Sequence, residues 1–147
     1  MSLDIRPASA ADHAVWEPLW QAYLRFYNTE LPEEVRATTW QRLLDPVEPM
    51  NAAIAWADGK AVGLVHWIYH RSCWSIEQSC YLQDLFVSAD VRGAGVGRAL
   101  IEHVCAQAKA AGSTRVYWLT QESNATARTL YDKVADCPGY IQYRKAL

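Results

Sequence analysis

The sequence predicts an α/β fold built on a mixed, strongly twisted sheet with helices on both faces. Two observations favour this fold class. An Asp58-Gly59 pair between two apolar segments is a hairpin signal, which predicts antiparallel neighbours. Further along, residues 81–104 read as an apolar strand, a glycine loop and a helix, and a crossover of this kind joins parallel strands. Both kinds of pairing are therefore expected in one sheet.

The first half of the chain predicts a strand, two helices and the hairpin. A short strand ends at Pro7, and a capping-box pattern at residues 9–12 opens a helix of about residues 10–27, where apolar side chains recur at helical spacing. Residues 31–45 predict a second helix with a proline near its start. Residues 52–70 contain the two strands of the hairpin.

The second half predicts three strands and two helices. A loop at residues 71–78 precedes a long strand at 80–87. The helix after the glycines is marked by an apolar stripe at helical spacing, formed by Val96, Leu100, Val104 and Ala108. A strand at 114–120, a helix at 124–135 and a closing strand at 139–147 complete the order β-α-α-β-β-β-α-β-α-β.

Composition indicates one domain over residues 1–147 and excludes several function classes. The chain is 51% hydrophobic and 20% charged, which is enough to bury a sizeable core. Its net charge of -2 gives no electrostatic case for nucleic-acid binding. No apolar run approaches the roughly 20 residues that span a bilayer, and the N-terminus lacks the apolar region of a signal peptide. We therefore expect a cytoplasmic protein with no membrane partner.

The cysteines and histidines indicate neither a disulfide framework nor a metal site. The four cysteines contain no C-x-x-C pair, so free thiols are expected in a reducing cytosol at Cys73, Cys80, Cys105 and Cys137. His66 and His70 lack the glutamate of an H-E-x-x-H zinc helix, and their segment predicts a strand, so no metal is expected.

Three alternating glycines, Gly93, Gly95 and Gly97, stand between the apolar strand and the helix. Free N–H groups at a helix N-terminus favour an anion, which indicates a phosphate or pyrophosphate site; a tight turn without a ligand is the alternative. A P-loop would require G-K-[ST], but Arg98 follows the last glycine, and a dinucleotide fingerprint would require G-x-G-x-x-G. The pattern present is R-x-x-G-x-G, beginning at Arg92.

That pattern, after a strand ending in DLFV, resembles the pyrophosphate-binding motif of the GNAT superfamily of acyl-CoA-dependent N-acetyltransferases. The segment NATARTLY, residues 124–131, is similar to the family's N-x-x-A-x-x-L-Y segment. The resemblance covers nearly the whole chain and implies the GNAT fold. More narrowly, residues 80–87 and the C-terminal residues resemble the histone/polyamine and spermidine N-acetyltransferase-like branch.

The resemblance implies acetyl-CoA as cosubstrate. The strand would supply backbone groups to the pantetheine arm, including an N–H near Phe86 that stabilises the oxyanion. The loop and its arginines would hold the pyrophosphate, and Asn124, Ala127 and Tyr131 share the face of the last helix. The implied cofactor-binding residues are Leu85, Phe86, Val87, Arg92, Gly93, Ala94, Gly95, Val96, Gly97, Arg98, Asn124, Ala127 and Tyr131.

Three residues are candidates for the chemistry. The resemblance implies that Tyr131 protonates the departing thiolate. Gln83 stands where the spermidine-acetyltransferase group carries a glutamate suggested as the base, and an amide cannot accept that proton. Asp84 follows it, but adjacent strand residues face opposite sides, so Asp84 is expected to face away from the cleft. Asp84 is then either a catalytic or a structural carboxylate, and a water chain is a further route for the proton.

The acceptor pocket is expected from residues 20–40 and the 66–78 region. The candidates are an aromatic wall of Trp20, Tyr23, Tyr27 and Trp74 and the acids Glu30, Glu33 and Glu77, with packed aromatics and a solvated edge as the alternative. We expect transfer of an acetyl group to a primary amine (polyamine, lysine or small amine) by direct attack. A non-catalytic acyl-CoA-sensing domain and a nucleotide-binding module are the alternatives. Family resemblance and the apolar closing strand predict a homodimer.

Overall fold

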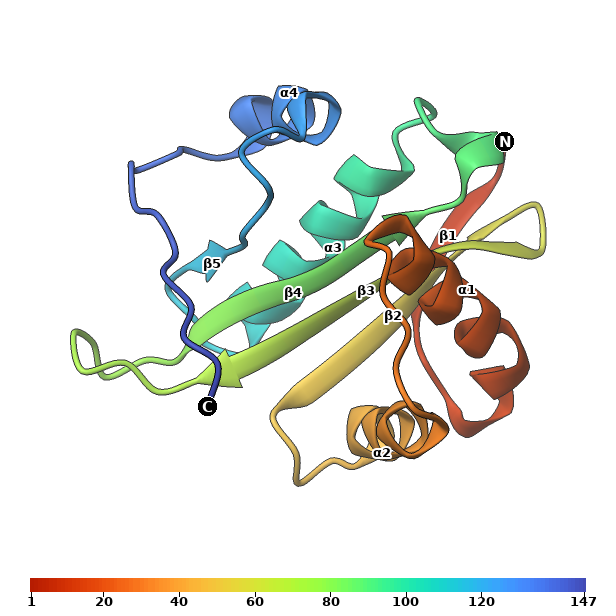
Figure 1. The fold of residues 1–147 in the computed structure, drawn as a ribbon, viewed down its shortest axis with the longest axis horizontal. Coiled ribbons are helices and arrows are strands. Elements are labelled where there is room, and N and C mark those ends of the chain that lie inside the picture. The colour runs from red at the N-terminus through yellow and green to blue at the C-terminus, as the bar shows by residue number, and fades with distance from the viewer.

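A computed structural model describes residues 1–147 and shows five strands in the order β1-β2-β3-β4-β5, with helices on both faces (Figure 1). The strands are β1 (Leu3–Pro7), β2 (Met50–Ala57), β3 (Lys60–His70), β4 (Ser79–Val87) and β5 (Val116–Tyr117). The helices are α1 (His13–Phe26), α2 (Glu33–Leu44), α3 (Val96–Ala110) and α4 (Ala125–Val134), with short 3₁₀ turns η1 (Ala10–Asp12) and η2 (Ala89–Val91). Strands β1 to β4 pair antiparallel and β5 pairs parallel with β4, so the mixed sheet is confirmed.

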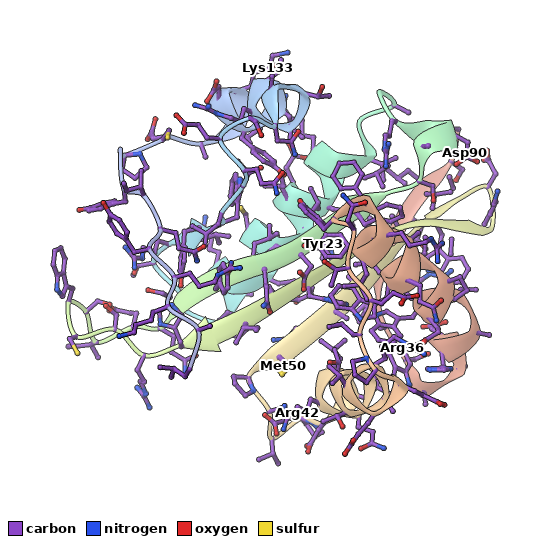
Figure 2. All side chains as sticks on the ribbon, in the orientation of Figure 1. Tyr23, Arg36, Arg42, Met50, Asp90 and Lys133 are labelled. Atoms are coloured by element: carbon purple, nitrogen blue, oxygen red, sulfur yellow. The ribbon has the colours of Figure 1, made fainter.

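Each face of the sheet buries its own apolar cluster. On one face, Trp16 and Trp20 of α1 and Leu43 of α2 pack against alternate residues of β2 and β3. On the other face, the expected stripe of α3 is fully buried, and α4 adds partly buried side chains. Arg36 lies between α2 and α1 (Figure 2), where its Nε donates to Glu17 Oε1 at 2.6 Å. The ion pair fixes the two helices to one another on their side of the sheet.

Strand β4 has a bulge where one of its residues is extra in the pairing with β3. His66 lies opposite Asp84, but the next pair is Trp67 and Leu82, so Gln83 has no partner across the ladder. A bulge of this kind breaks the strict alternation of sides along a strand. The expectation that Asp84 faces away from Gln83 is therefore wrong, because it assumed an unbroken ladder.

Strand β5 is shorter than expected. Only Val116 and Tyr117 pair with β4, opposite Cys80 and Tyr81, whereas the apolar pattern predicted a strand over 114–120. Beyond that pair the chain diverges from β4, because residues 118–120 run toward α4 instead of continuing along the sheet (Figure 1). The edge of β4 after Tyr81 therefore has no neighbouring strand.

The expected closing strand is absent, and this prediction is wrong. Residues 139–147 run alongside β5 without joining a ladder (Figure 1). An alternating apolar pattern forms a strand only where an edge of matching length is free to pair, and β5 offers two residues. As a result Tyr140, Ile141 and Tyr143 are 84%, 75% and 90% exposed.

No helix is long and apolar enough to cross a membrane. All four cysteines are unpaired. No group of three or more His, Cys, Asp or Glu side chains is arranged to hold a metal ion. His66 instead lies buried in β3 against Asp84, and His70 contacts the Tyr117 hydroxyl at 2.7 Å.

Candidate active site

The glycine loop presents main-chain donors at the N-terminus of α3. Gly93 and Gly95 have φ angles of 85° and 84°, in the left-handed region that glycine adopts most easily, and Gly95 is the N-cap. No side chain caps the helix, and its first backbone bond runs from Ala99 N to Gly95 O at 3.0 Å. The N–H groups left without an acceptor belong to Gly93, Gly95, Val96, Gly97 and Arg98. Such a cluster of free donors fits an anion.

The two arginines of the motif are engaged with the protein itself. Arg92 donates through Nε to the Val87 carbonyl at 3.0 Å and lies over the rings of Phe26 and Phe86. Arg98 pairs with Glu102 on the exposed surface of α3, at 3.0 Å. The anion site is thus built mainly from backbone N–H groups, with the arginine charges placed around it.

Gly97 differs from the other two glycines. It lies within α3, and a Cβ added there would stand 3.5 Å from Leu130 Cδ2 of α4. Such a distance is ordinary van der Waals contact, so α4 packs against α3 at this glycine without requiring it. Asn124 acts as the expected N-cap of α4, since its side-chain oxygen accepts from Ala127 N at 3.3 Å.

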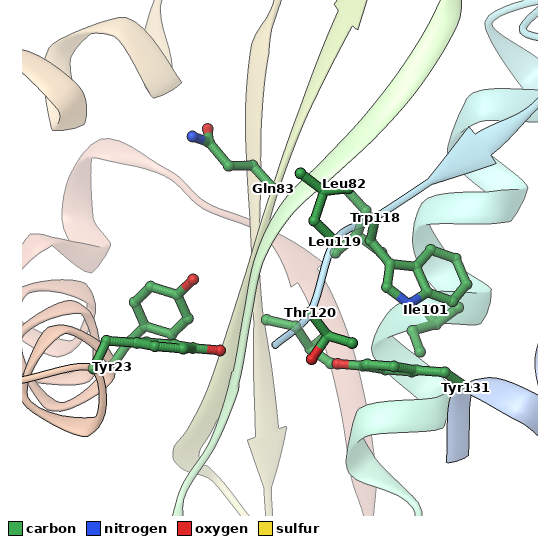
Figure 3. A pocket seen from close by; sticks show the side chains of 10 residues that line it. Tyr23, Leu82, Gln83, Ile101, Trp118, Leu119, Thr120 and Tyr131 are labelled. Atoms are coloured by element: carbon green, nitrogen blue, oxygen red, sulfur yellow. The ribbon is translucent and has the colours of Figure 1, made fainter. Parts of the chain in front are cut away.

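The unpaired edge of β4 borders a narrow cleft (Figure 3). Ser88 N donates to Val62 O at 2.8 Å, across the β3 side of the ladder. Because N–H directions alternate along a strand, the N–H of Phe86 also points to β3, and those of Leu85 and Val87 point to the open edge. The expected donor near Phe86 is therefore one of its two neighbours. The cleft is lined by Tyr23, Tyr27, Leu82, Gln83, Leu85, Ile101, Trp118, Leu119, Thr120 and Tyr131.

Tyr131 reaches this cleft from α4, with its hydroxyl directed toward Thr120 (Figure 3). Trp118 packs against the ring edge-on, with centroids 5.5 Å apart. Burial, and then the neighbouring Tyr27, raise the pKa of the Tyr131 phenol above its usual value. A phenol with a raised pKa keeps its proton at neutral pH, so Tyr131 can act as a proton donor here.

A larger cavity of about 360 Å³ lies on the other side of Gln83, between α1, α2 and the sheet. Its lining is mostly apolar: Trp20, Tyr23, Leu24, Leu31, Thr39, Leu43, Met50, His66, Ile68, Gln83 and Asp84. Asp84 is the only carboxylate among them, and no Lys or Arg is present. Tyr23 and Gln83 line both spaces, so the cleft and the cavity meet at these two side chains.

The bulge places Gln83 and Asp84 on the same cavity, although they are adjacent in β4. Asp84 is buried, and its Oδ2 lies 3.0 Å from His66 Nδ1. Burial, and then the charge of Asp84, raise the pKa of the Tyr23 hydroxyl. A buried anion beside an apolar cavity is suited to bind one ammonium group.

The structure separates the expected acceptor residues. Trp20 and Tyr23 line the cavity and Tyr27 lines the cleft. Trp74 lies in the loop beyond the ends of β3 and β4 and is 93% exposed, away from both spaces. The acids Glu30, Glu33 and Glu77 are also exposed and border neither space. The sequence pattern missed Trp16 and His66 as site residues, because a contact between a helix and a strand, or across two strands, leaves no local signal.

Known proteins resemble this chain over nearly its whole length. A family model described as Acetyltransferase (GNAT) family matches residues 15–135. The D-amino-acid N-acetyltransferase HPA3 of Saccharomyces cerevisiae is 36% identical over 143 residues, which cover 96% of this chain and 89% of that protein.

Solved structures share the fold. AAC(6')-Iy in complex with the bisubstrate analog CoA-S-monomethyl-acetylneamine superposes with a TM-score of 0.85 at 20% identity, covering 100% of each chain. A ribosomal-protein-alanine N-acetyltransferase from Brucella melitensis biovar Abortus 2308 has a TM-score of 0.80 at 21% identity, covering 99% of this chain and 100% of that one. The expected fold class is thereby confirmed.

Replacing Gly95 by Asp tests the loop as an anion site. The φ of 84° strains any side chain, and the new carboxylate would repel the expected ligand, the pyrophosphate of coenzyme A, at the free N–H groups. We expect calorimetry to show binding of coenzyme A weakened by about tenfold or more, the equivalent of about 1.4 kcal/mol. Gly112→Asp is the matched control, because Gly112 has the same φ of 84° beyond the opposite end of α3. Undiminished affinity in folded Gly95→Asp protein would reject the site.

Proposed function

The chain belongs to the GNAT family of acetyltransferases, and on that premise we propose that it transfers the acetyl group of acetyl-CoA directly to the primary amine of a small, mainly apolar molecule. One observation carries the proposal: a donor cleft and an acceptor cavity meet at Tyr23 and Gln83, with a single buried carboxylate beside the junction. The family and the 36% identical relative support an enzyme rather than the sensing module or the nucleotide-binding module.

In this proposal acetyl-CoA occupies the cleft. The free N–H groups from Gly93 to Arg98 hold the pyrophosphate at the start of α3. The pantetheine arm lies along the unpaired edge of β4, where the N–H groups of Leu85 and Val87 are directed. One of these donors holds the thioester oxygen and stabilises the oxyanion when the amine attacks.

In the proposed reaction Asp84 binds the amine and removes a proton from it. Its Oδ2 lies 3.0 Å from His66 Nδ1, and in this proposal the carboxylate binds the ammonium group and accepts a proton from it. The neutral nitrogen then attacks the thioester carbon, the C–S bond breaks, and the thiolate leaves with a proton from Tyr131. The nitrogen releases its second proton as the amide forms, and a proton returns to the Tyr131 phenolate through solvent. Gln83, at the junction of the two spaces, orients the nitrogen without taking its proton.

The cavity favours one class among the possible acceptors. A single carboxylate matches a single ammonium group, whereas polyamines and aminoglycosides carry several. The apolar walls match an apolar substituent. The relative named for D-amino acids suggests the α-amino group of an amino acid with an apolar side chain, its carboxylate remaining at the mouth. The narrower resemblance to the polyamine branch receives no support from this lining.

Two broader expectations remain part of the proposal. The residues from 1 to 147 contain both half-sites, which supports one catalytic domain. The four unpaired thiols support a cytoplasmic location, since disulfides persist in oxidising compartments.

A panel of amines tests the acceptor class, with released thiol as the readout. We expect D-leucine and D-phenylalanine to react with a kcat/KM at least about tenfold above that of D-glutamate, because a second carboxylate would be buried without a cation. Spermidine and kanamycin are the multiply charged comparisons, and the L-amino acids test handedness. Preference for spermidine with inert apolar amines would overturn the proposed class.

Tyr131→Phe tests the proton donor. It keeps the ring that packs on Trp118 and removes only the hydroxyl. The thiolate of coenzyme A has a conjugate acid with a pKa of about 8.5, so it leaves tolerably even without a proton, and we expect kcat to fall by about 10²-fold. The affinity for acetyl-CoA should stay near that of the wild type. Tyr140→Phe, an exposed phenol, is the control. A wild-type rate in Tyr131→Phe, with chemistry rate-limiting, would remove this role.

A homodimer is proposed from the C-terminal segment. Its exposed Tyr140, Ile141 and Tyr143 leave an apolar surface beside the two-residue strand β5, and a second copy of this segment would cover it. Light scattering at tens of micromolar should give twice the mass of one chain. Ile141→Asp with Tyr143→Asp should give a single chain, because charges in that surface oppose burial. A monomeric wild-type protein would contradict the proposal.

A further inference from the structure

The buried contact of Asp84 with His66 extends to a third residue, Trp16 of α1. The indole Nε1 of Trp16 lies 3.0 Å from His66 Nε2, and His66 Nδ1 lies 3.0 Å from Asp84 Oδ2. Trp16 and His66 are 0% and 3% exposed, so water does not compete for these contacts. The chain of contacts runs from the core under α1 to the proposed amine site.

From this geometry we infer that His66 is a positioning residue that orients the Asp84 carboxylate toward the acceptor amine, and that Trp16 holds His66 in place by donating to its Nε2. The inference rests on the proposed role of Asp84 in binding the amine. The bulge at Gln83 is what brings His66 and Asp84 opposite one another across the ladder.

The tautomer follows from the chemistry of the indole. An indole N–H can only donate, so His66 Nε2 must be the acceptor and carries no proton. The single proton of the neutral ring is then on Nδ1, where it donates to Asp84. A doubly protonated ring would bring two N–H groups face to face at Trp16.

A neutral donor has a consequence for Asp84 that a cation would not have. A histidinium would compensate the carboxylate charge, whereas neutral His66 fixes its direction and leaves that charge for the ammonium group of the substrate. The ring itself is held by Trp20, with centroids 4.8 Å apart, and by Trp16 at 6.0 Å. The two hydrogen bonds of the His66 ring, to Trp16 and to Asp84, therefore define one orientation of the carboxylate.

The tautomer is measured first, by nitrogen NMR of the histidine rings in the wild-type protein. We expect His66 as the neutral ring with the proton on Nδ1. In Trp16→Phe, which keeps an aromatic ring but lacks the N–H, we expect the Nε2 signal to shift, because that nitrogen loses its hydrogen-bond donor while Asp84 still accepts from Nδ1. An unchanged Nε2 signal in the variant, or a proton on Nε2 in the wild type, would overturn the role of Trp16.

Kinetics of four variants test the role of His66, with D-leucine and acetyl-CoA as substrates. His66→Leu removes the donor, and we expect kcat/KM for the amine to fall by about 10- to 100-fold with the KM for acetyl-CoA unchanged. His66→Asn places an amide N–H near the position of Nδ1 and should recover most of that loss. When Asp84→Asn is already present, adding His66→Leu should not lower kcat/KM for the amine any further, since His66 acts through Asp84.

Each unexpected result of these experiments would contradict a different claim. If no amine is acetylated, the proposed function fails, and the tautomer measurement still decides the role of Trp16. Full activity of Asp84→Asn removes the proposed role of Asp84 and the inference with it. Equal losses in folded His66→Leu and His66→Asn, or additive losses with Asp84→Asn, overturn the inference alone, because ring volume would then explain the effect.

Discussion

The extra residue that Gln83 adds to β4 is the constraint on which both halves of the site depend. A regular strand would send Gln83 and Asp84 to opposite faces of the sheet. With the bulge, both border the cavity under α1, and Leu82 still packs in the core against α3. The same irregularity puts Asp84 opposite His66, so the carboxylate borders the cavity while in contact with the imidazole.

The second requirement is the separation of β5 from β4. Two paired residues hold the strands together, and the chain then diverges, which leaves main-chain N–H groups without partners along β4. Unpaired donors at the start of α3 continue this line around the glycine loop. An extended ligand with an anionic end matches both sets of donors, and α4 closes the cleft by presenting Tyr131 from the far side.

The features that could be predicted from the sequence are those with local causes. The hairpin at Asp58-Gly59 and the N-cap at Asn124 are each recorded in a few adjacent residues, and the structure has both. The positive φ angles of Gly93 and Gly95 likewise explain the glycine spacing that indicated an anion site.

The features that could not be predicted depend on residues distant in the chain. The bulge exists only in the register of β4 against β3, and the early end of β5 depends on where α4 sits. The contact of Trp16 with His66 joins residues 50 positions apart. Residues 139–147 are the opposite case, in which a local pattern predicted a strand that does not form. Their pattern is that of a strand, but the sheet offers no edge of sufficient length.

The two spaces draw their walls from different stretches of the polypeptide. The walls of the proposed acceptor cavity come largely from residues 20–50, whereas most of those of the cleft come from 82–131, and the two spaces share only Tyr23 and Gln83. In evolutionary terms, the acceptor specificity of such a fold can change through substitutions in the first third of the chain, while the residues that line the cleft stay the same. Only Tyr23 and Gln83 are under selection from both the cleft and the cavity, so these two residues should change most slowly.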